Sequence, residues 1–234
     1  MRVELGWQGE QLVDGLVALS LIGAAGEVSR QTFPLQVASG EVVLGQYNVP
    51  IDADVPGGDY RLRARLIAAD GAPLGKAVDL APLSIQPVAA SFAKPPISHP
   101  LRVDLGERVD LAGYDLGADR VAPGDSIELT LYWHPQGRLT QGLKVFTHLV
   151  GPDGRIVAQR DSIPVEGARP TTGWRPGEYI ADRYRIAVPR DAATGRYELR
   201  VGLYDPTTGE RLPVSADGAP QPDGQVRLSE VTVG

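Results

Sequence analysis

The stretch from Gly167 to Glu178 has the residue types of a recognition site. It combines Trp174 with Arg169, Arg175 and Thr171 in a segment rich in glycine and proline. An exposed indole could stack on a sugar ring while the guanidinium and hydroxyl groups donate hydrogen bonds, and loops on rigid scaffolds often carry such contacts. Alternatively, Trp174 caps the end of a core and the Arg-Pro pairs shape a turn. The sequence favours the structural interpretation, and the four named side chains are retained as the predicted ligand-binding set.

Other residue types with catalytic or metal-binding potential lack the required spacing. The three histidines are His99, His134 and His148, and they form neither H-x-x-x-H nor H-E-x-x-H. His148 alternates with Phe146 and Val150, which predicts a partly buried structural imidazole. The chain has no cysteine and no G-x-S-x-G motif. We therefore predict no catalytic residue, no metal ion and no cofactor.

Carboxylates are plentiful but fall where hairpins should turn. Asp52-Ala53-Asp54, Asp153 and Asp205 are examples, and aspartate is favoured there because its side chain hydrogen-bonds the local backbone. A glycosidase-like pair is defined by separation in space, so it stays an alternative that the sequence leaves open.

Short strands must position these residues. The 234 residues include 28 glycines and 20 prolines without collagen periodicity, a composition typical of many turns. Period-2 alternation in Tyr60–Leu66 places Arg61, Arg63 and Arg65 on one face and apolar groups on the other, and 197–204 repeats this pattern. No helical periodicity persists, so the sequence predicts an all-β fold of half-buried antiparallel strands.

The two halves of the chain align with each other. Trp7 matches Trp133, and Tyr60 matches Tyr197, with intervening pairs in the same order. The offset grows from 126 to 137, so the second copy is the longer one, with much of the excess after Pro164. The matched tryptophans predict a shared core position rather than two ligand platforms.

These patterns predict two tandem immunoglobulin-like antiparallel β-sandwich domains. Residues 1–88 should form the first and shorter domain, residues 89–104 a linker that contains Pro95, Pro96 and Pro100 and follows Pro87, and residues 105–234 the second domain. Strands of the second domain are expected near 108–116, 126–134, 143–151, 155–162, 178–188, 197–204, 211–215 and 225–233. The strand at 109–116 has no counterpart in the first copy, so the first domain is expected to lack its N-terminal strand and the chain to be cut from a longer polypeptide.

Charge and hydropathy limit the partners. The formal net charge is −6, whereas nucleic-acid binders gather lysine and arginine into a positive footprint, so nucleic acid is not a predicted partner. The sequence has no leader-type apolar segment and no run of 18 apolar residues, so membrane insertion by this segment is not predicted.

Four motifs of the second copy carry a family resemblance: Leu131-Tyr132-Trp133, 145–161, 169–178 and 202–205. Through them, residues 105–234 resemble the extracytoplasmic β-sandwich region that follows the membrane part of some bacterial glycosyltransferases of the dolichyl-phosphate-mannose mannosyltransferase type (glycosyltransferase family 39). The catalytic carboxylates of that family belong to its membrane part. The resemblance implies a segment on the cell surface or the periplasmic side, tethered through an upstream membrane region, whose partner is a glycan or the membrane part of its own polypeptide.

We therefore predict a non-catalytic extracytoplasmic accessory or interaction module of a larger, membrane-associated, glycosyltransferase-like protein. One alternative is a carbohydrate-binding module, which requires an exposed Trp174. The other is a structural spacer or adhesin-like stalk, which requires two rigidly coupled domains.

Overall fold

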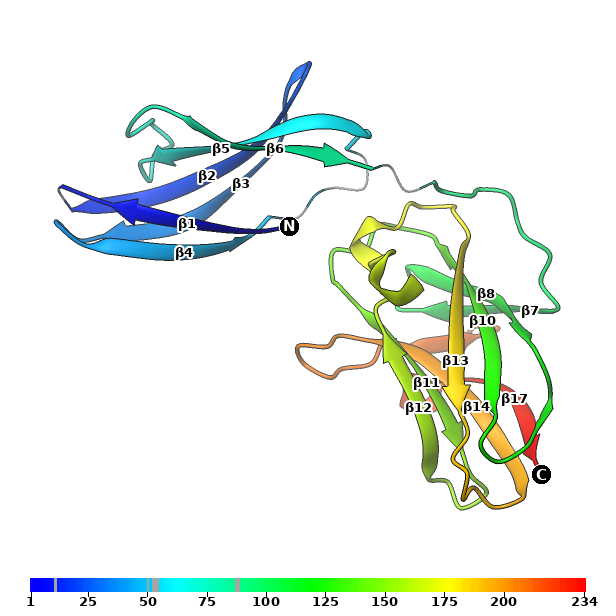
Figure 1. The fold of residues 1–234 in the computed structure, drawn as a ribbon. Helices are drawn as coiled ribbons and strands as arrows, with labels where there is room; N and C mark the ends of the chain where they lie inside the picture. Colours follow the sequence, from blue (N-terminus) through cyan, green and yellow to red (C-terminus); the bar gives the residue numbers. More distant parts are fainter. Residues whose placement is uncertain (11, 50, 52–54, 87–88) are drawn as a thin grey trace. The chain divides into compact units, whose positions relative to one another are not determined.

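The computed structural model describes residues 1–10, 12–49, 51, 55–86 and 89–234. The turn predicted at Asp52–Asp54 and the linker proline Pro87 lie outside these residues. The described chain consists of β-strands, turns and three short 3₁₀ helices at Val165–Gly167, Thr171–Gly173 and Pro222–Gly224. None of its helices is long and apolar enough to span a membrane. The chain divides into two compact units, Met1–Val88 and Ala89–Gly234 (Figure 1).

The first unit is a small sandwich of two antiparallel sheets. Strand β1 (Arg2–Gln8) pairs with β4 (Val42–Asn48) in one sheet. The other sheet has the order β3 (Gly26–Val37), β2 (Val13–Gly23), β5 (Gly58–Ile67), β6 (Val78–Ile85). Eight buried apolar residues, including Leu19, Tyr47 and Leu62, form the core that the described residues build between the sheets.

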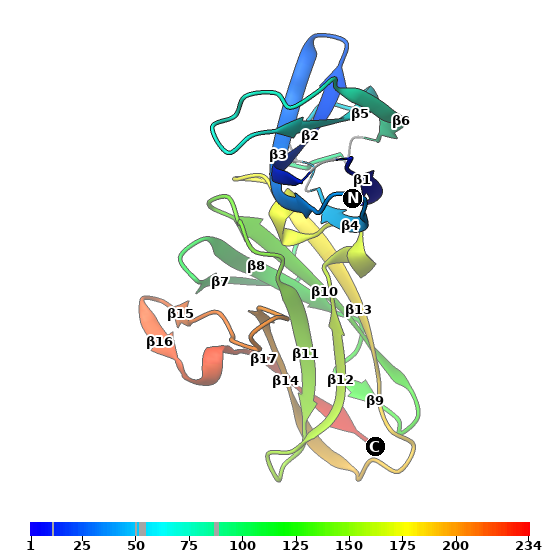
Figure 2. The same cartoon turned by 90° about the vertical axis from the view of Figure 1, so that its left-hand side faces the viewer.

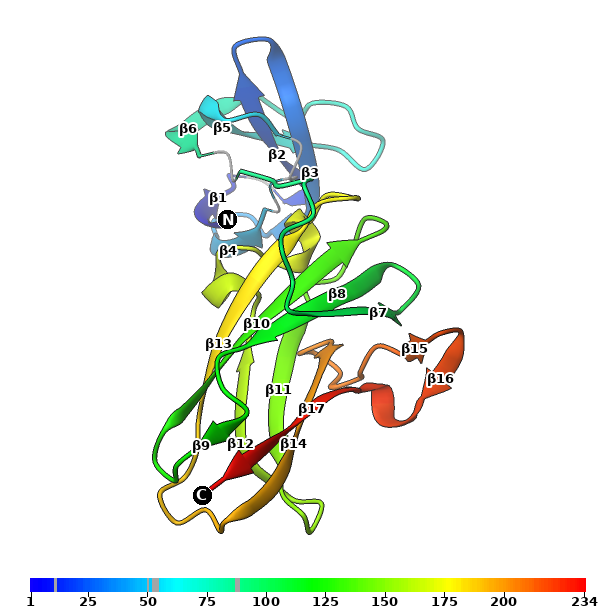
Figure 3. The ribbon, with the colours of Figure 1, turned by 90° about the vertical axis from the view of Figure 1, so that its right-hand side faces the viewer.

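The second unit is a larger sandwich (Figures 2 and 3). One sheet has the order β13 (Ile180–Ala187), β10 (Ser126–Pro135), β8 (Val109–Leu116), β7 (His99–Leu105), β15 (Val214–Ala216), β16 (Ala219–Gln221). The other has the order β12 (Ile156–Ser162), β11 (Lys144–Val150), β14 (Gly195–Tyr204), β17 (Val226–Val233), β9 (Arg120–Val121). Strand β9 runs parallel to β17, and the other pairs are antiparallel. The core cluster contains 26 buried apolar residues.

The predicted repeat is confirmed by strand order. Strands β1 to β5 occupy the places of β10 to β14, and β6 that of β17. Tyr60 and Tyr197 begin equivalent strands, and their hydroxyls donate to carbonyls four residues upstream, Pro56 O at 2.8 Å and Ala193 O at 2.7 Å. Such a tyrosine corner fixes the crossing between the two sheets of a sandwich. The prediction of an all-β chain with two tandem antiparallel sandwiches is therefore confirmed.

The matched tryptophans point into the two cores, as predicted. Trp133 is fully buried and Trp7 is half-buried. Trp7 Nε1 donates directly to the Tyr47 hydroxyl at 2.9 Å, whereas Trp133 Nε1 donates to Asp182 Oδ2 at 3.1 Å. Strand register makes Gly45 the equivalent of Asp182, so the second unit has a carboxylate where the first has no side chain.

The expected linker at residues 89–104 needs correction. Residues from His99 onward form strand β7, which pairs with β8, and Ser91 already bridges to Tyr179. The second unit thus begins at Ala89. Pro100 concealed the strand in the sequence, but the β7–β8 register shifts after Pro100, and proline is tolerated near the start of a strand or at an irregularity.

All eight strands expected in the second domain are present, the one expected at 211–215 as the shorter β15. Strands β7, β9 and β16 were missed. Within the described residues of the first unit, no strand corresponds to β7, β8 or β9, which agrees with the expectation of a shorter first sandwich.

Candidate functional site

The segment from Gly167 to Glu178 forms an end wall of the second core. Trp174 is only 1% exposed, and its ring centroid lies 6.2 Å from that of Trp133 in a stacked arrangement. Its indole Nε1 donates to the carbonyl of Arg169 at 3.0 Å. This burial agrees with the favoured interpretation, in which Trp174 caps the end of a core, and contradicts the alternative in which its ring stacks on a ligand.

Thr171 is also part of this wall. Its side chain is fully buried, its hydroxyl donates to Gln141 O at 2.7 Å, and its oxygen accepts from the backbone N–H of Leu143 at 2.9 Å. Thr171 thus satisfies two backbone groups that precede β11. The prediction that its hydroxyl contacts a ligand is wrong for the same reason, since neither of its hydrogen-bonding functions faces solvent.

Arg169 is directed inward, toward a buried carboxylate. Its Nη2 lies 2.6 Å from Glu178 Oε1, with side-chain exposures of 12% for Arg169 and 0% for Glu178. The same Oε1 accepts the backbone N–H of the half-buried Arg175 at 2.7 Å. The predicted ligand-binding set is therefore brought together, but around Glu178 and the core. The sequence interpretation missed Glu178, although an acidic residue that follows two arginines in one short segment is a signal for an internal ion pair.

A second buried carboxylate, Asp182, lies beside this wall on β13. Its Oδ2 accepts from Trp133 Nε1 and from the Tyr184 hydroxyl, the latter at 2.6 Å, and its Oδ1 accepts from the backbone N–H of Val165 at 2.7 Å. Burial raises the pKa of Asp182 above its ordinary value, and it also raises the pKa of Tyr184. Through these three hydrogen bonds, Asp182 connects β10, β13 and the turn at Val165.

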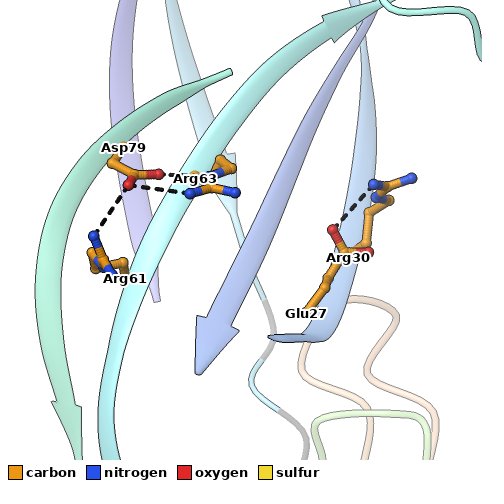
Figure 4. A network of polar contacts seen from close by, with 5 residues as sticks. All are labelled: Glu27, Arg30, Arg61, Arg63 and Asp79. Atoms are coloured by element: carbon orange, nitrogen blue, oxygen red, sulfur yellow. Dashed lines mark hydrogen bonds and ion pairs between the residues drawn. The ribbon is translucent and has the colours of Figure 1, made fainter. Parts of the chain in front are cut away.

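A network of exposed ion pairs lies on the outward face of the four-stranded sheet in the first unit (Figure 4). Strand register aligns Asp79, Arg63, Ser20 and Arg30 in one row across β6, β5, β2 and β3. Arg63 binds Asp79 through two hydrogen bonds of 2.6 and 3.2 Å, and Arg30 Nε donates to Ser20 Oγ at 3.4 Å. Figure 4 also shows Arg61 beside Asp79, with Nη1 3.5 Å from Oδ2. Arg30 Nη2 also donates to Glu27 Oε2 on the same strand at 3.0 Å, so each arginine drawn in Figure 4 has an acidic partner.

The face is basic although its domain is acidic. Residues 1–88 contain six basic and ten acidic residues, and four of the six basic ones share this face. These are Arg30, Arg61, Arg63 and Arg65, which we call the arginine face. The hydrogen bond from Arg63 lowers the pKa of Asp79, so this carboxylate stays ionised and holds Arg63 in place.

The second unit carries an equivalent row on its equivalent sheet. Register aligns Arg227, Arg200, His148 and Gln159 across β17, β14, β11 and β12. Arg200 takes the place of Arg63, and both its Nε and Nη2 donate to Glu198 Oε2, at 2.9 and 2.6 Å. The two units thus place a clamped arginine at the same point of the same sheet.

Aromatic rings accompany this second row. His148 lies with its centroid 4.7 Å from that of Phe146, and Arg211 Cζ stands 4.4 Å above the Phe146 ring. Gly202, opposite Phe146, leaves the space that the ring fills, since an added Cβ would collide with it. Burial lowers the pKa of His148, and Arg211 and Arg200 lower it further against the opposing effect of Asp161. His148 is 6% exposed, which confirms its prediction as a structural imidazole.

In the part of the chain that the structure describes, no group of three or more His, Cys, Asp or Glu side chains is arranged to hold a metal ion.

No family model matches this chain, and no curated protein matches it. Among solved structures, the chain is similar to the crystal structure of a protein from Corynebacterium diphtheriae that is described as membrane anchored, with 13% sequence identity and a TM-score of 0.23. The alignment covers 98% of this chain and 56% of that one, so this chain spans little more than half its length.

Proposed function

We propose that this chain is a non-catalytic, extracytoplasmic interaction module, an accessory part of a membrane-associated glycosyltransferase-like protein. The observation that carries the proposal is the pair of equivalent rows, in which two units of different size hold an arginine at the same point of the same outward sheet face. The resemblance of residues 105–234 to the region that follows a transferase membrane part supports the location. The tyrosine corners support an immunoglobulin-like topology for both units, and the place of β9 beside β17 supports it for the second unit.

The chemistry of the arginine face favours an anionic partner. Guanidinium groups match carboxylate and phosphate oxygens with two parallel hydrogen bonds, and held arginines lose little conformational freedom when they bind. An acidic glycan presents such groups at regular spacing along an extended chain. We therefore take an acidic glycan as the partner of this face, rather than a neutral sugar stacked on Trp174.

The two fully buried carboxylates support the non-catalytic part of the proposal. Glu178 is paired with Arg169, and Asp182 accepts three hydrogen bonds inside the core. Perturbed carboxylates in a cleft are candidates for acid–base catalysis, but structural networks perturb them as well. Asp182 has both of its oxygens hydrogen-bonded inside the core, and Glu178 holds Arg169 and the Arg175 N–H through Oε1, whereas Glu178 Oε2 is buried without a hydrogen-bond partner.

The test is an array of acidic (uronate- or phosphate-bearing) and neutral glycans, probed with the full chain. We expect binding to acidic glycans that weakens as salt rises, because exposed charges are screened. The double variant Arg30→Glu/Arg61→Glu should lower affinity at least tenfold. The matched control is Arg2→Glu, which changes an exposed arginine of the same unit on β1 and should leave affinity unchanged.

The second row is tested by Arg211→Glu. Arg211 is exposed, and the change removes the cation that lies above the Phe146 ring. A further loss of acidic-glycan binding is expected when it is added to the double variant. Three results would overturn the proposal: no binding to acidic glycans, equal binding to neutral glycans, or a loss of affinity in Arg2→Glu as large as that in the double variant.

A further inference from the structure

The two units differ in how strand β1 and its equivalent β10 are covered. In the second unit, β10 lies between β13 and β8, and its inward side chains are at most 1% exposed. In the first unit, β1 pairs with β4 alone among the described residues, and the equivalent inward side chains are half-buried. The inward residues are Leu129, Leu131 and Trp133 in the second unit, and their equivalents in the first unit are Val3, Leu5 and Trp7. Among the residues that the structure describes, one edge of β1 thus has no pairing strand, whereas the same edge of β10 is paired with β8.

A groove of 290 Å³ opens where that neighbour would lie. Leu5 and Trp7 from β1 line one side, and Leu66, Val78 and Leu80 from β5 and β6 line the other. Val78, in this lining, is 57% exposed. Of the large apolar residues that are exposed in the described chain, eight of eleven belong to the first unit although it is the smaller one.

The second unit shows what fits at this place. Strand β8 pairs with β10 so that Leu111 faces Trp133 and Tyr114 faces Leu131. The Tyr114 hydroxyl also donates to Leu228 O on β17 at 3.1 Å, so β8 closes the gap between the two sheets. The position of Leu228 corresponds to that of Leu80 in the first unit, which lines the groove.

We propose that this groove binds an extended segment of a partner polypeptide, which pairs antiparallel with β1 and inserts alternate apolar side chains against Trp7 and Leu5. Addition of a strand to an exposed sheet edge is a known mode of peptide recognition, in which main-chain hydrogen bonds give affinity and side-chain pockets give specificity. Unpaired strand edges are otherwise a liability that proteins cover or blunt. The inference goes beyond the proposed function. Arg65 of the arginine face also lines the groove, but Arg30 and Arg61, the two residues replaced in the glycan test, do not.

Charge further defines the partner. Arg65 and Lys76 line the groove together with the apolar residues. The segment that fills the equivalent place in the second unit, Val109–Leu116, alternates apolar residues with Asp110 and Asp115. The partner segment is therefore one of about seven or eight residues in which apolar side chains alternate with acidic ones.

The probe is a fluorescently labelled synthetic peptide with the sequence of residues 107–118, added to the full chain. We expect saturable binding by fluorescence anisotropy, with a blue shift of Trp7 emission that is lost in Trp7→Phe. Val78→Asp should weaken binding at least tenfold, because it places a negative charge in the groove that repels the acidic side chains of the peptide. Its matched control is Val42→Asp on β4, where the wild-type side chain is 63% exposed, and this variant should bind as the wild type does.

Several results would overturn the inference. These are a scrambled peptide that binds equally well, absence of saturable binding, or equal losses in Val78→Asp and Val42→Asp while circular dichroism shows both folded. Concentration-dependent dimerisation without peptide, abolished by Val78→Asp, would assign the groove to a second copy and overturn it too. Arg30→Glu/Arg61→Glu should bind the peptide normally, so failure of this inference and failure of the glycan proposal are distinguishable.

Discussion

Replacement of Trp174 by alanine separates the structural role of the Gly167–Glu178 segment from a ligand-binding role. The indole is 1% exposed, stacks on Trp133 and donates to a buried carbonyl. Truncation of a buried tryptophan costs about 3–5 kcal/mol of unfolding free energy. Loss of the aromatic pair and of the hydrogen bond, each worth roughly 1 kcal/mol, places the expected loss near the upper end of that range.

The assay is urea unfolding of the full chain in a Trp7→Phe background. In that background all remaining tryptophans belong to the second unit, and in the additional variant Trp174→Ala only Trp133 reports. With a urea dependence of roughly 2 kcal/mol per molar, the midpoint of the second unit should fall by about 2 M. Acrylamide should quench Trp174 poorly in the native chain.

An exposed binding residue would behave differently. Surface substitutions usually change stability by no more than about 0.5 kcal/mol. A midpoint shift below roughly 0.3 M, together with ready quenching of Trp174, would therefore refute the placement of this side chain in the core.

Three further perturbations follow from the same contacts. Tyr60→Phe and Tyr197→Phe should each lower the free energy of unfolding by about 1 kcal/mol, and only in the unit that carries the change. Hydrogen exchange measures the stability of each unit separately, and a loss in the other unit would contradict independent tyrosine corners. Burial raises the folded-state pKa of Asp182, so the stability that this group contributes is fully present below its unfolded pKa of about 4 and is lost as pH rises through the higher folded pKa. The free energy of unfolding of Asp182→Asn, measured against pH, should lack this decline. Parallel curves for the wild type and the variant would contradict the argument. Glu178→Ala should cost about 3–5 kcal/mol because it leaves Arg169 as a nearly buried, unpaired charge, whereas Glu178→Gln should cost less by thermal unfolding, and equal costs would argue against a charge effect.

The strand pattern was predictable because alternation and turn residues are local properties. The repeated Tyr60 and Tyr197, each at the start of an alternating run, located equivalent strands and hence the sandwich order. Strand β7 was missed because a local rule about Pro100 argued against a strand that its pairing with β8 accommodates. Two roles stayed open for Trp174, because a loop rich in glycine and proline has the same composition whether it faces solvent or closes a core. The favoured structural role is the one that the burial of Trp174 supports.

Sequence alone determined the secondary structure class, the repeat and the alternation that aligns Arg61, Arg63 and Arg65, because each depends on residues that are near one another in the chain. Tertiary structure alone decided which rows form across strands, such as Arg200 beside His148, and which carboxylates are buried. It also revealed that β1 pairs with β4 alone within the described residues. Cross-strand neighbours and burial depend on register and on the second sheet, and these relations join residues far apart in sequence that leave no short-range pattern.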